Sequence, residues 1–303
     1  MEFEFASKKE EKPEKDPIVF AGMYEDTEEV KILRIPEGTV EICENAFRGF
    51  EKIVELYIPK SVKKISAAAF LGCKNLEKVK IEFGTAEILD EAFSACQSLR
   101  EIILPDSVIR LGEGCFEGCA SLSRVKLPEG LEMIGASCFN YCFNLTDVDI
   151  PDSCILVEFM AFANCFGLET VRISNEIRVI SESVFEGCRS LKEVELPTKL
   201  VKISARAFKG CTSLAQIILP VGMKILGFDA FADCTSLRRI ALPKGLSEIE
   251  DFDAFSSCDS LTDISFGGSE EEFSRLMRGR VLTLQRSNTQ AFVPKIHFMD
   301  LKI

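Results

Sequence analysis

The chain has 303 residues, 47% hydrophobic and 28% charged, an ordinary balance for a folded protein that excludes long-range disorder. Acidic residues outnumber basic ones by 48 to 36, and the net charge of -12 excludes nucleic acid and anionic membranes as default partners. No stretch approaches the roughly 20 apolar residues of a membrane span, so we expect no membrane insertion.

The first segment, residues 1–17, is charged and contains proline, which predicts a flexible, solvated arm. It lacks the basic start and apolar run that mark a secretory signal. Either the protein works inside the cell, in the cytoplasm, or the natural protein carries a leader before this sequence, and the sequence does not separate these two alternatives.

Residues 18–266 are organised by an internal repeat that is anchored on one phenylalanine column. Eight of the nine spacings in this column are 23 residues and the last is 24, a regularity that chance does not produce. The column is Phe47, Phe70, Phe93, Phe116, Phe139, Phe162, Phe185, Phe208, Phe231 and Phe255.

Other columns repeat with the same period. A cysteine follows the phenylalanine by three residues in every unit except the first, where Phe50 stands instead. In the units that have this cysteine, a leucine lies three residues after it. The unit reads L-x-x-V-x-L-P-x-x-L-x-x-I-x-x-x-A-F-x-x-C-x-x. The cysteine column is Cys73, Cys96, Cys119, Cys142, Cys165, Cys188, Cys211, Cys234 and Cys258.

This unit predicts one parallel β-strand per repeat. In L-x-x-V-x-L alternate residues face opposite sides, and the proline that usually follows ends the strand. The spacing in A-F-x-x-C-x-x-L predicts a short helical turn or a tight coil. Because one unit buries too little surface alone, the units must stack into an α/β or mostly β solenoid with a shared core. About eleven strands at ~4.8 Å give a sheet roughly 50 Å long. We expect the core column to include Phe70, Phe93, Phe116, Phe139, Phe162, Phe185, Phe208 and Phe231.

The repeat resembles the BspA-like, or Treponema pallidum-type, leucine-rich repeats. The resemblance covers about residues 28–266 and rests on the 23-residue period, on the proline after the strand and on A-F-x-x-C. It implies a right-handed superhelix of about ten to eleven units. The strands would line the concave face, and short coil or helical turns the convex face.

Residues 267–303 resemble the end of such repeat domains, and we expect a C-terminal cap made of a helix and a final strand. Ser269 and Glu272 form a capping-box pattern, and Phe273, Leu276 and Met277 form an apolar stripe.

Thirteen cysteines raise the question of a metal site or of disulfides. The pairs Cys115 with Cys119 and Cys138 with Cys142 fall in adjacent units, the arrangement of a four-thiolate zinc site. The repeat explains the same cysteines as small apolar core residues, since Cys115 and Cys138 fall in the alanine column. We therefore expect reduced, buried thiols and no metal.

The sequence offers little for catalysis. His297 is the only histidine, and no nucleophile motif lies near it. Asp147 and Asp149 are two residues apart on a predicted strand and point into solvent together. This arrangement is more typical of a charged surface than of a catalytic acid–base pair. Phosphate-binding glycine motifs are missing from the sequence. We expect no enzymatic activity and no cofactor.

The third and fifth residues of each strand vary freely, whereas the inward columns hardly vary, so the outward positions are free for recognition. In the middle units the series Lys126, Asp149, Arg172 and Glu195 alternates in sign, which is also expected of a self-neutralising ladder. The first half instead predicts a basic patch with apolar members, which is our candidate partner-binding site. Its residues are Tyr57, Lys78, Lys80, Ile103, Arg124 and Lys126.

These patterns favour a non-catalytic protein-binding module that uses its concave sheet face. The resemblance implies an adhesion-type role, with a host or cell-surface protein as partner. An intracellular scaffold or structural protein is the alternative, favoured by the many free thiols and by the missing leader.

Overall fold

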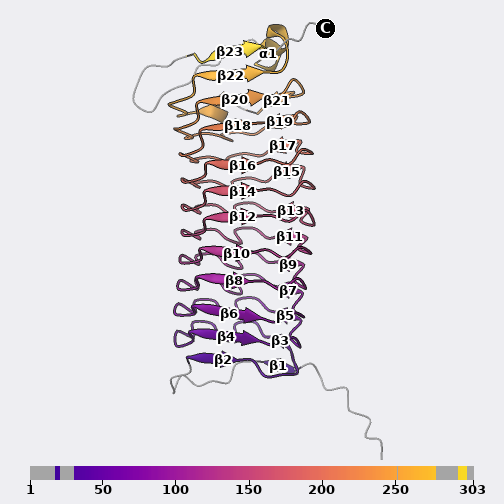
Figure 1. Cartoon of the computed structure of the whole chain (residues 1–303), viewed down its shortest axis with the longest axis vertical. Coiled ribbons are helices and arrows are strands. Elements are labelled where there is room, and N and C mark those ends of the chain that lie inside the picture. The colour runs from indigo at the N-terminus through magenta and orange to yellow at the C-terminus, as the bar shows by residue number, and fades with distance from the viewer. Residues whose placement is uncertain (1–17, 21–30, 251, 278–292, 299–303) are drawn as a thin grey trace, which may run out of the picture.

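The computed structural model describes residues 18–20, 31–250, 252–277 and 293–298, which form a single stack of turns around one core (Figure 1). The elements are parallel strands with almost no helix, so the predicted solenoid is confirmed. In the view of Figure 1 the turns rise along one nearly straight axis. The predicted arm, residues 1–17, lies outside the described residues.

One side of the stack is the predicted sheet, which we call the long-strand face. Its strands pair in parallel in three successive runs of five, three and four strands, with residue i opposite residue i+23 until the C-terminal end of the stack. Their inward residues are buried or half-buried while the outward ones are mostly exposed, as the alternation predicts. The strands are β2 Ile32–Arg34, β4 Glu55–Ile58, β6 Lys78–Ile81, β8 Glu101–Ile103, β10 Arg124–Lys126, β12 Asp147–Asp149, β14 Thr170–Arg172, β16 Glu193–Glu195, β18 Gln216–Ile218, β20 Arg239–Leu242, β22 Asp263–Phe266 and β23 Lys295–Phe298.

A second parallel ladder, which the sequence analysis did not predict as strands, forms another side of the stack. Most of its strands have only two residues, one outward and one inward, such as Lys64 and Ile65 in β5. The inward residue belongs to the second apolar pair of the repeat, and its burial holds the backbone in register. The strands are β1 Ile18–Phe20, β3 Thr39–Ile42, β5 Lys64–Ile65, β7 Glu87–Ile88, β9 Arg110–Leu111, β11 Met133–Ile134, β13 Leu156–Val157, β15 Val179–Ile180, β17 Lys202–Ile203, β19 Ile225–Leu226 and β21 Glu248–Ile249.

The A-F-x-x-C segments are tight turns, the second of the two predicted forms. They also join successive units, because each core phenylalanine donates its backbone N–H to the next unit; Phe70 N, for example, lies 2.8 Å from Ala92 O. A 3₁₀ helix, η1 Phe252–Phe255, stands in the one unit with a 24-residue spacing. Where the strands of both ladders are paired, each turn is therefore hydrogen-bonded to its neighbours on three sides.

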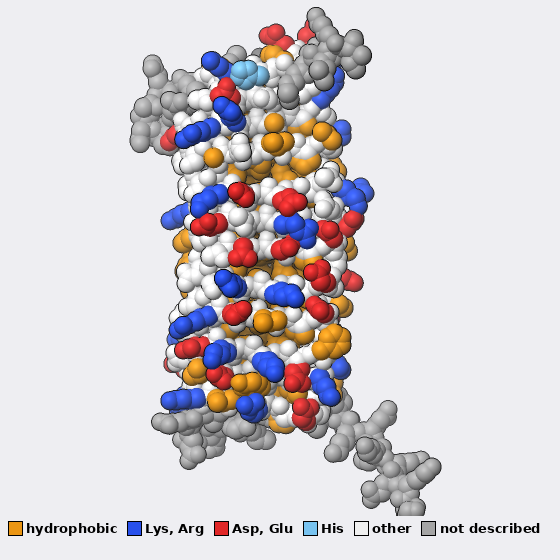
Figure 2. All heavy atoms as spheres, in the orientation of Figure 1, with side chains coloured by type: hydrophobic (Ala, Val, Ile, Leu, Met, Phe, Trp, Pro, Cys, Tyr) orange, Lys and Arg blue, Asp and Glu red, His pale blue; other side chains and the backbone are white. Residues whose placement is uncertain are grey.

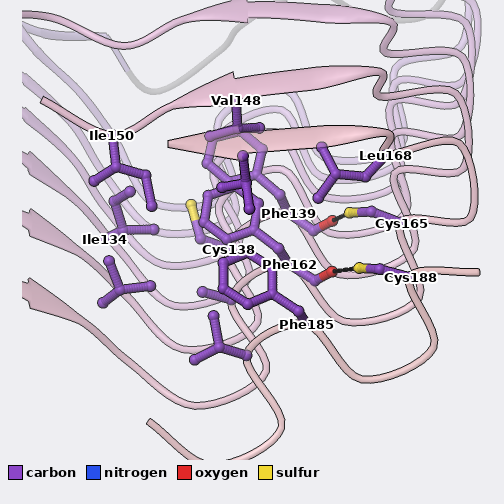
Figure 3. Close-up of a cluster of buried hydrophobic side chains, with 14 of the residues drawn as sticks. Ile134, Cys138, Phe139, Val148, Ile150, Phe162, Cys165, Leu168, Phe185 and Cys188 are labelled. Carbon is purple, nitrogen blue, oxygen red and sulfur yellow. Dashed lines mark hydrogen bonds between the residues drawn. The ribbon is translucent and has the colours of Figure 1, made fainter. Parts of the chain in front are cut away.

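The core is a continuous stack of phenylalanine rings. Phe70 and Phe93 are fully buried, with ring centroids 5.1 Å apart and planes 7° from parallel, and the same stacking continues to Phe255. Rings this close and nearly parallel are in the range of favourable aromatic contact. Figure 3 shows Phe139, Phe162 and Phe185 stacked in the middle of the molecule.

The C-terminal end carries the one α-helix of the described residues, α1 Glu270–Leu276. The predicted capping box is confirmed: Ser269 Oγ accepts from the Glu272 N–H, and Glu272 accepts from the Ser269 N–H. Phe273 and Met277 are buried against the last turns, and β23 pairs with β22. The described helices include none that is long and apolar enough to cross a bilayer.

Candidate binding face

The long-strand face is a row of outward side chains, two from each strand. Within each run of paired strands, parallel register places equivalent residues of successive units directly beside one another, so the third and fifth positions form two columns. Figure 2 shows basic, acidic and apolar side chains interspersed over this face. The sequence-predicted site lies on its first five turns.

At the start of the face, Tyr57 and Lys78 are held by contacts within the chain. The Tyr57 hydroxyl donates to Glu55 at 3.1 Å, and the Arg34 guanidinium lies 4.0 Å above the tyrosine ring. Lys78 Nζ pairs with Glu55 Oε1 at 3.1 Å, and hydrogen bonds from Lys78 and Tyr57 lower the pKa of Glu55. Tyr57 is thereby presented as a fixed, half-buried ring.

The next turns bring together Lys80, Ile103 and Lys126. Ile103 lies directly between the two lysines in the strand register, and 60% of its surface is exposed. Within the described ranges, Lys80, Lys126 and the neighbouring Arg124 form no ion pair. Beside Ile103 the face is hollowed into a shallow depression of about 580 Å³, lined in part by Lys78, Lys80 and Ile103. This group combines an apolar side chain with cations that have no counterion among the described residues.

In the middle of the face the expected self-neutralising ladder forms only in part. Arg172 Nε lies 2.5 Å from Asp149 Oδ1, and its Nη1 lies 3.0 Å from Asp152. A backbone hydrogen bond from Asn175, and then Arg172, lower the pKa of Asp152. Across the described residues, Lys126 and Glu195 have no such pair, so the alternation in sequence does not neutralise the whole column.

The cysteine column is buried, and its thiols have a specific role. Each thiol donates to the carbonyl of the phenylalanine one unit earlier: Cys165 Sγ lies 3.1 Å from Phe139 O, and Cys188 Sγ lies 3.1 Å from Phe162 O (Figure 3). All thirteen cysteines lie in the described ranges, and none forms a disulfide. A cysteine is thus small enough for this column and also satisfies a buried carbonyl.

The zinc alternative finds no support in this arrangement. The thiols of Cys119 and Cys142 are directed at the carbonyls of Phe93 and Phe116. Burial raises the pKa of Cys119 and of Cys142 far from the range in which a thiolate forms. Throughout the described part of the chain, no three His, Cys, Asp or Glu side chains are grouped to hold a metal ion.

His297, the only histidine, lies on the exposed final strand β23. Its Nε2 is 2.9 Å from Asp263 Oδ1 on β22, and this contact lowers the pKa of Asp263. The pair joins the last two strands, which is a structural role in the cap.

Two exposed surfaces were not assigned by the sequence analysis. One is Ile218, which is 76% exposed in the fifth-position column. The sequence indicated it by an isoleucine at an outward strand position. The other is an aromatic cluster on the turns before β12 and β14, where Tyr141 packs edge-on to Phe143 and Phe143 stacks on Phe166. Its signal was an aromatic residue at a position that is polar or small in most units.

The fold and this face define a leucine-rich-repeat solenoid, and the repeats identify its family. The pattern of the BspA type leucine rich repeat region matches residues 40–167 and 156–277, in six copies, so the chain belongs to that family. Its members are repeat proteins that are generally not enzymes, with a fold typical of protein-interaction or surface proteins.

Several solved structures are similar. A leucine rich cell surface protein from Faecalibacterium prausnitzii is 26% identical, with a TM-score of 0.44 and 81% of each chain covered. The Treponema pallidum leucine rich repeat protein is 26% identical, with a TM-score of 0.44, covering 68% of this chain and 78% of that one. The pneumococcal vaccine antigen PcpA is 20% identical, with a TM-score of 0.57, covering 88% of this chain and 79% of that one, a likeness of fold. No curated protein sequence matches the chain.

Proposed function

We propose that this chain is a non-catalytic protein-binding module whose contact surface is the first half of the long-strand face. The observation that carries the proposal is Ile103, which is 60% exposed between Lys80 and Lys126. An outward isoleucine gains nothing from folding unless another molecule covers it. The two lysines, which form no ion pair in the described residues, supply attraction at its edges.

The chemistry of the site defines the partner: a protein with an acidic surface and an apolar side chain that packs on Ile103. Tyr57, fixed by Glu55 and Arg34, adds a rigid aromatic contact at the start of the site. Because the attraction is largely between exposed charges, association should weaken as salt rises. The family favours an adhesion-type role, in which the partner is a host or cell-surface protein.

The test compares capture of such a partner by the wild-type chain and by a triple variant, Tyr57→Ala, Ile103→Ala and Lys126→Glu. We expect the triple variant to lose the partner while its thermal midpoint stays within a few degrees, because all three side chains point away from the core.

A matched control makes the same types of change on the short-strand side: Arg110→Glu, Leu156→Ala and Val179→Ala, all exposed. This control should keep the partner. Unchanged capture by the long-strand triple variant would refute the proposed site.

An intracellular scaffold is the second candidate, favoured by thirteen cysteines without a disulfide. Protease treatment of intact source cells separates the two roles. A surface adhesin is removed by the protease, whereas a scaffold is protected.

A further inference from the structure

On the six central turns of the long-strand face, β8 to β18, the outward charges are arranged so that each cation is related to an anion by a two-fold axis. Their fifth-position side chains read apolar, positive, negative, positive, negative, apolar. Reading the column backwards exchanges every cation for an anion and leaves an isoleucine at each end. The side chains are, in order, Ile103, Lys126, Asp149, Arg172, Glu195 and Ile218.

The members of this pattern are available for contact. Ile103 is 60% exposed and Ile218 is 76% exposed, at equal distances from the boundary between β12 and β14. In the third-position column one mirror-related pair repeats this polarity, Arg124 on β10 with Glu193 on β16. Among the described residues, Arg124, Lys126, Glu193 and Glu195 form no ion pair. Both columns therefore contain unsatisfied charges of opposite sign in mirror-related places.

We propose that a second copy of this chain docks face to face on these six turns, with its stack inverted. The two-fold axis runs parallel to the strands, between β12 and β14. It places Ile103 against Ile218 of the second copy, and Lys126 against Glu195 of the second copy. Arg124 likewise meets Glu193 of the second copy. The inference rests on the proposed function, because it names a partner for part of the same face.

Other arrangements of two copies match the face less well. If both stacks ran in the same direction, each turn would meet itself, and Lys126 would face Arg124 of the second copy. If the axis lay between β10 and β12, Lys126 would face Asp149 of the second copy, which Arg172 already holds at 2.5 Å. That register would also bury Ile103 against a guanidinium. The proposed register pairs Lys126 with Glu195 and Arg124 with Glu193, charges that form no ion pair within the described part of their own chain.

The contact is smaller than a standard protein–protein interface. Six turns offer two outward side chains each, about half of the roughly 20–30 residues per side of a standard interface. A self-association in the micromolar range is therefore expected, about 1–100 µM. Because the contact is rich in ion pairs, salt should weaken it.

Sedimentation equilibrium on the full chain, from about 1 to 200 µM, tests this inference. We expect a monomer–dimer equilibrium that each of Lys126→Glu and Glu195→Lys weakens at least tenfold, since each creates two like-charge contacts per dimer. The double variant should regain the wild-type constant, because the exchanged charges again face each other. Ile218→Asp should weaken the dimer. Ile155→Asp changes another exposed isoleucine, 66% exposed and off this face, and should leave the dimer unchanged.

A monomer at every concentration would overturn the inference, as would a dimer insensitive to these changes. If the double variant dimerised as weakly as the single variants, the proposed register would be wrong. With the axis between β10 and β12, the exchanged charges would meet like charges on the second copy. The proposed function fails separately. Tyr57 and Lys80 lie outside the six turns. The double variant Tyr57→Ala, Lys80→Glu should therefore reduce partner capture and leave dimerisation unchanged.

Discussion

Raising the pH should unfold this protein through its buried thiols. Burial raises the pKa of Cys73, Cys188 and Cys258 to about 12, and that of Cys154 to about 11, from an ordinary value near 9.0. In the unfolded chain these thiols lose their protons near pH 9, whereas in the folded chain they stay protonated. The stability they contribute is therefore fully present below pH 9 and is lost as the pH rises from there toward 12.

The size of the effect follows from linkage. Between the two pKa values, each thiol lowers the free energy of unfolding by about 1.4 kcal/mol per pH unit, or about 2 kcal/mol by pH 10.5. The four thiols together remove about 8 kcal/mol, comparable with the whole stability of a typical domain, roughly 5–15 kcal/mol. Other buried thiols add to this, because burial raises their pKa values further. They are Cys96, Cys115, Cys119, Cys142, Cys165, Cys211 and Cys234.

Urea unfolding under reducing conditions, at half-unit steps from pH 7 to 10.5, measures this loss. We expect stability to be flat to about pH 8.5 and then to fall steeply. Cys188→Ala is the control. It lowers the free energy of unfolding at pH 7, because it leaves a cavity, and it also removes one titrating thiol. Its slope with pH should be shallower than that of the wild type by about 1.4 kcal/mol per unit. A wild-type slope near zero above pH 9 would refute the reasoning, since the thiols would then ionise in the folded state.

Other predictions concern the core and the turns. Phe139→Ala should cost roughly 3–5 kcal/mol in denaturant melts, because stacked rings enclose it on both sides; Phe50→Ala, at the half-buried end of the stack, should cost less. A loss below about 1 kcal/mol at Phe139 would mean that the ring column is not the core. Ala95→Gly should stabilise by about 0.5–1 kcal/mol, since Ala95 has φ 57°, and Gly118→Ala, at φ 69° in the same column, should destabilise by a similar amount. Equal effects of the same sign would show that backbone strain is not the cause. Iodoacetamide should label Cys43 in the native protein, because it is the one cysteine that is not fully buried. In denatured protein that has not been reduced, iodoacetamide should label most cysteines. Four or more disulfides by mass spectrometry would contradict the assignment of free thiols.

The repeat was predictable because its inward columns are set by packing alone. Phe70 and its equivalents recur every 23 residues, and each is buried in the structure on the ring of the next unit. The capping box of Ser269 and Glu272 was predictable for a similar reason, since it is a local pattern with one geometry.

The short-strand ladder was not predictable from the same pattern. An apolar pair such as Leu200 and Ile203 has a spacing that fits either coil or helix, and only stacking on neighbouring units makes two residues pair as a strand. The thiol hydrogen bonds were hidden as well. They join Cys165 to Phe139, 26 residues earlier, a separation that no local motif encodes.

The binding face lies between these cases. Which residues point outward followed from the alternation along each strand, but which charges are already neutralised did not. Lys78 is engaged by Glu55, and Arg172 by Asp149 and Asp152, whereas Lys126 is in no ion pair of the described residues. Side-chain reach across neighbouring turns decides these pairings, and the sequence does not record it.

Lysine acetylation of the protein in complex with its captured partner tests most directly whether the long-strand face binds. The account predicts that acetylation of Lys80 and Lys126 falls several-fold in the complex relative to the free chain. Lys224, exposed beside the short strand β19, should be modified equally in both samples. Protection of Lys224 with full reactivity at Lys80 and Lys126 would contradict the account and place the partner on the short-strand side of the stack.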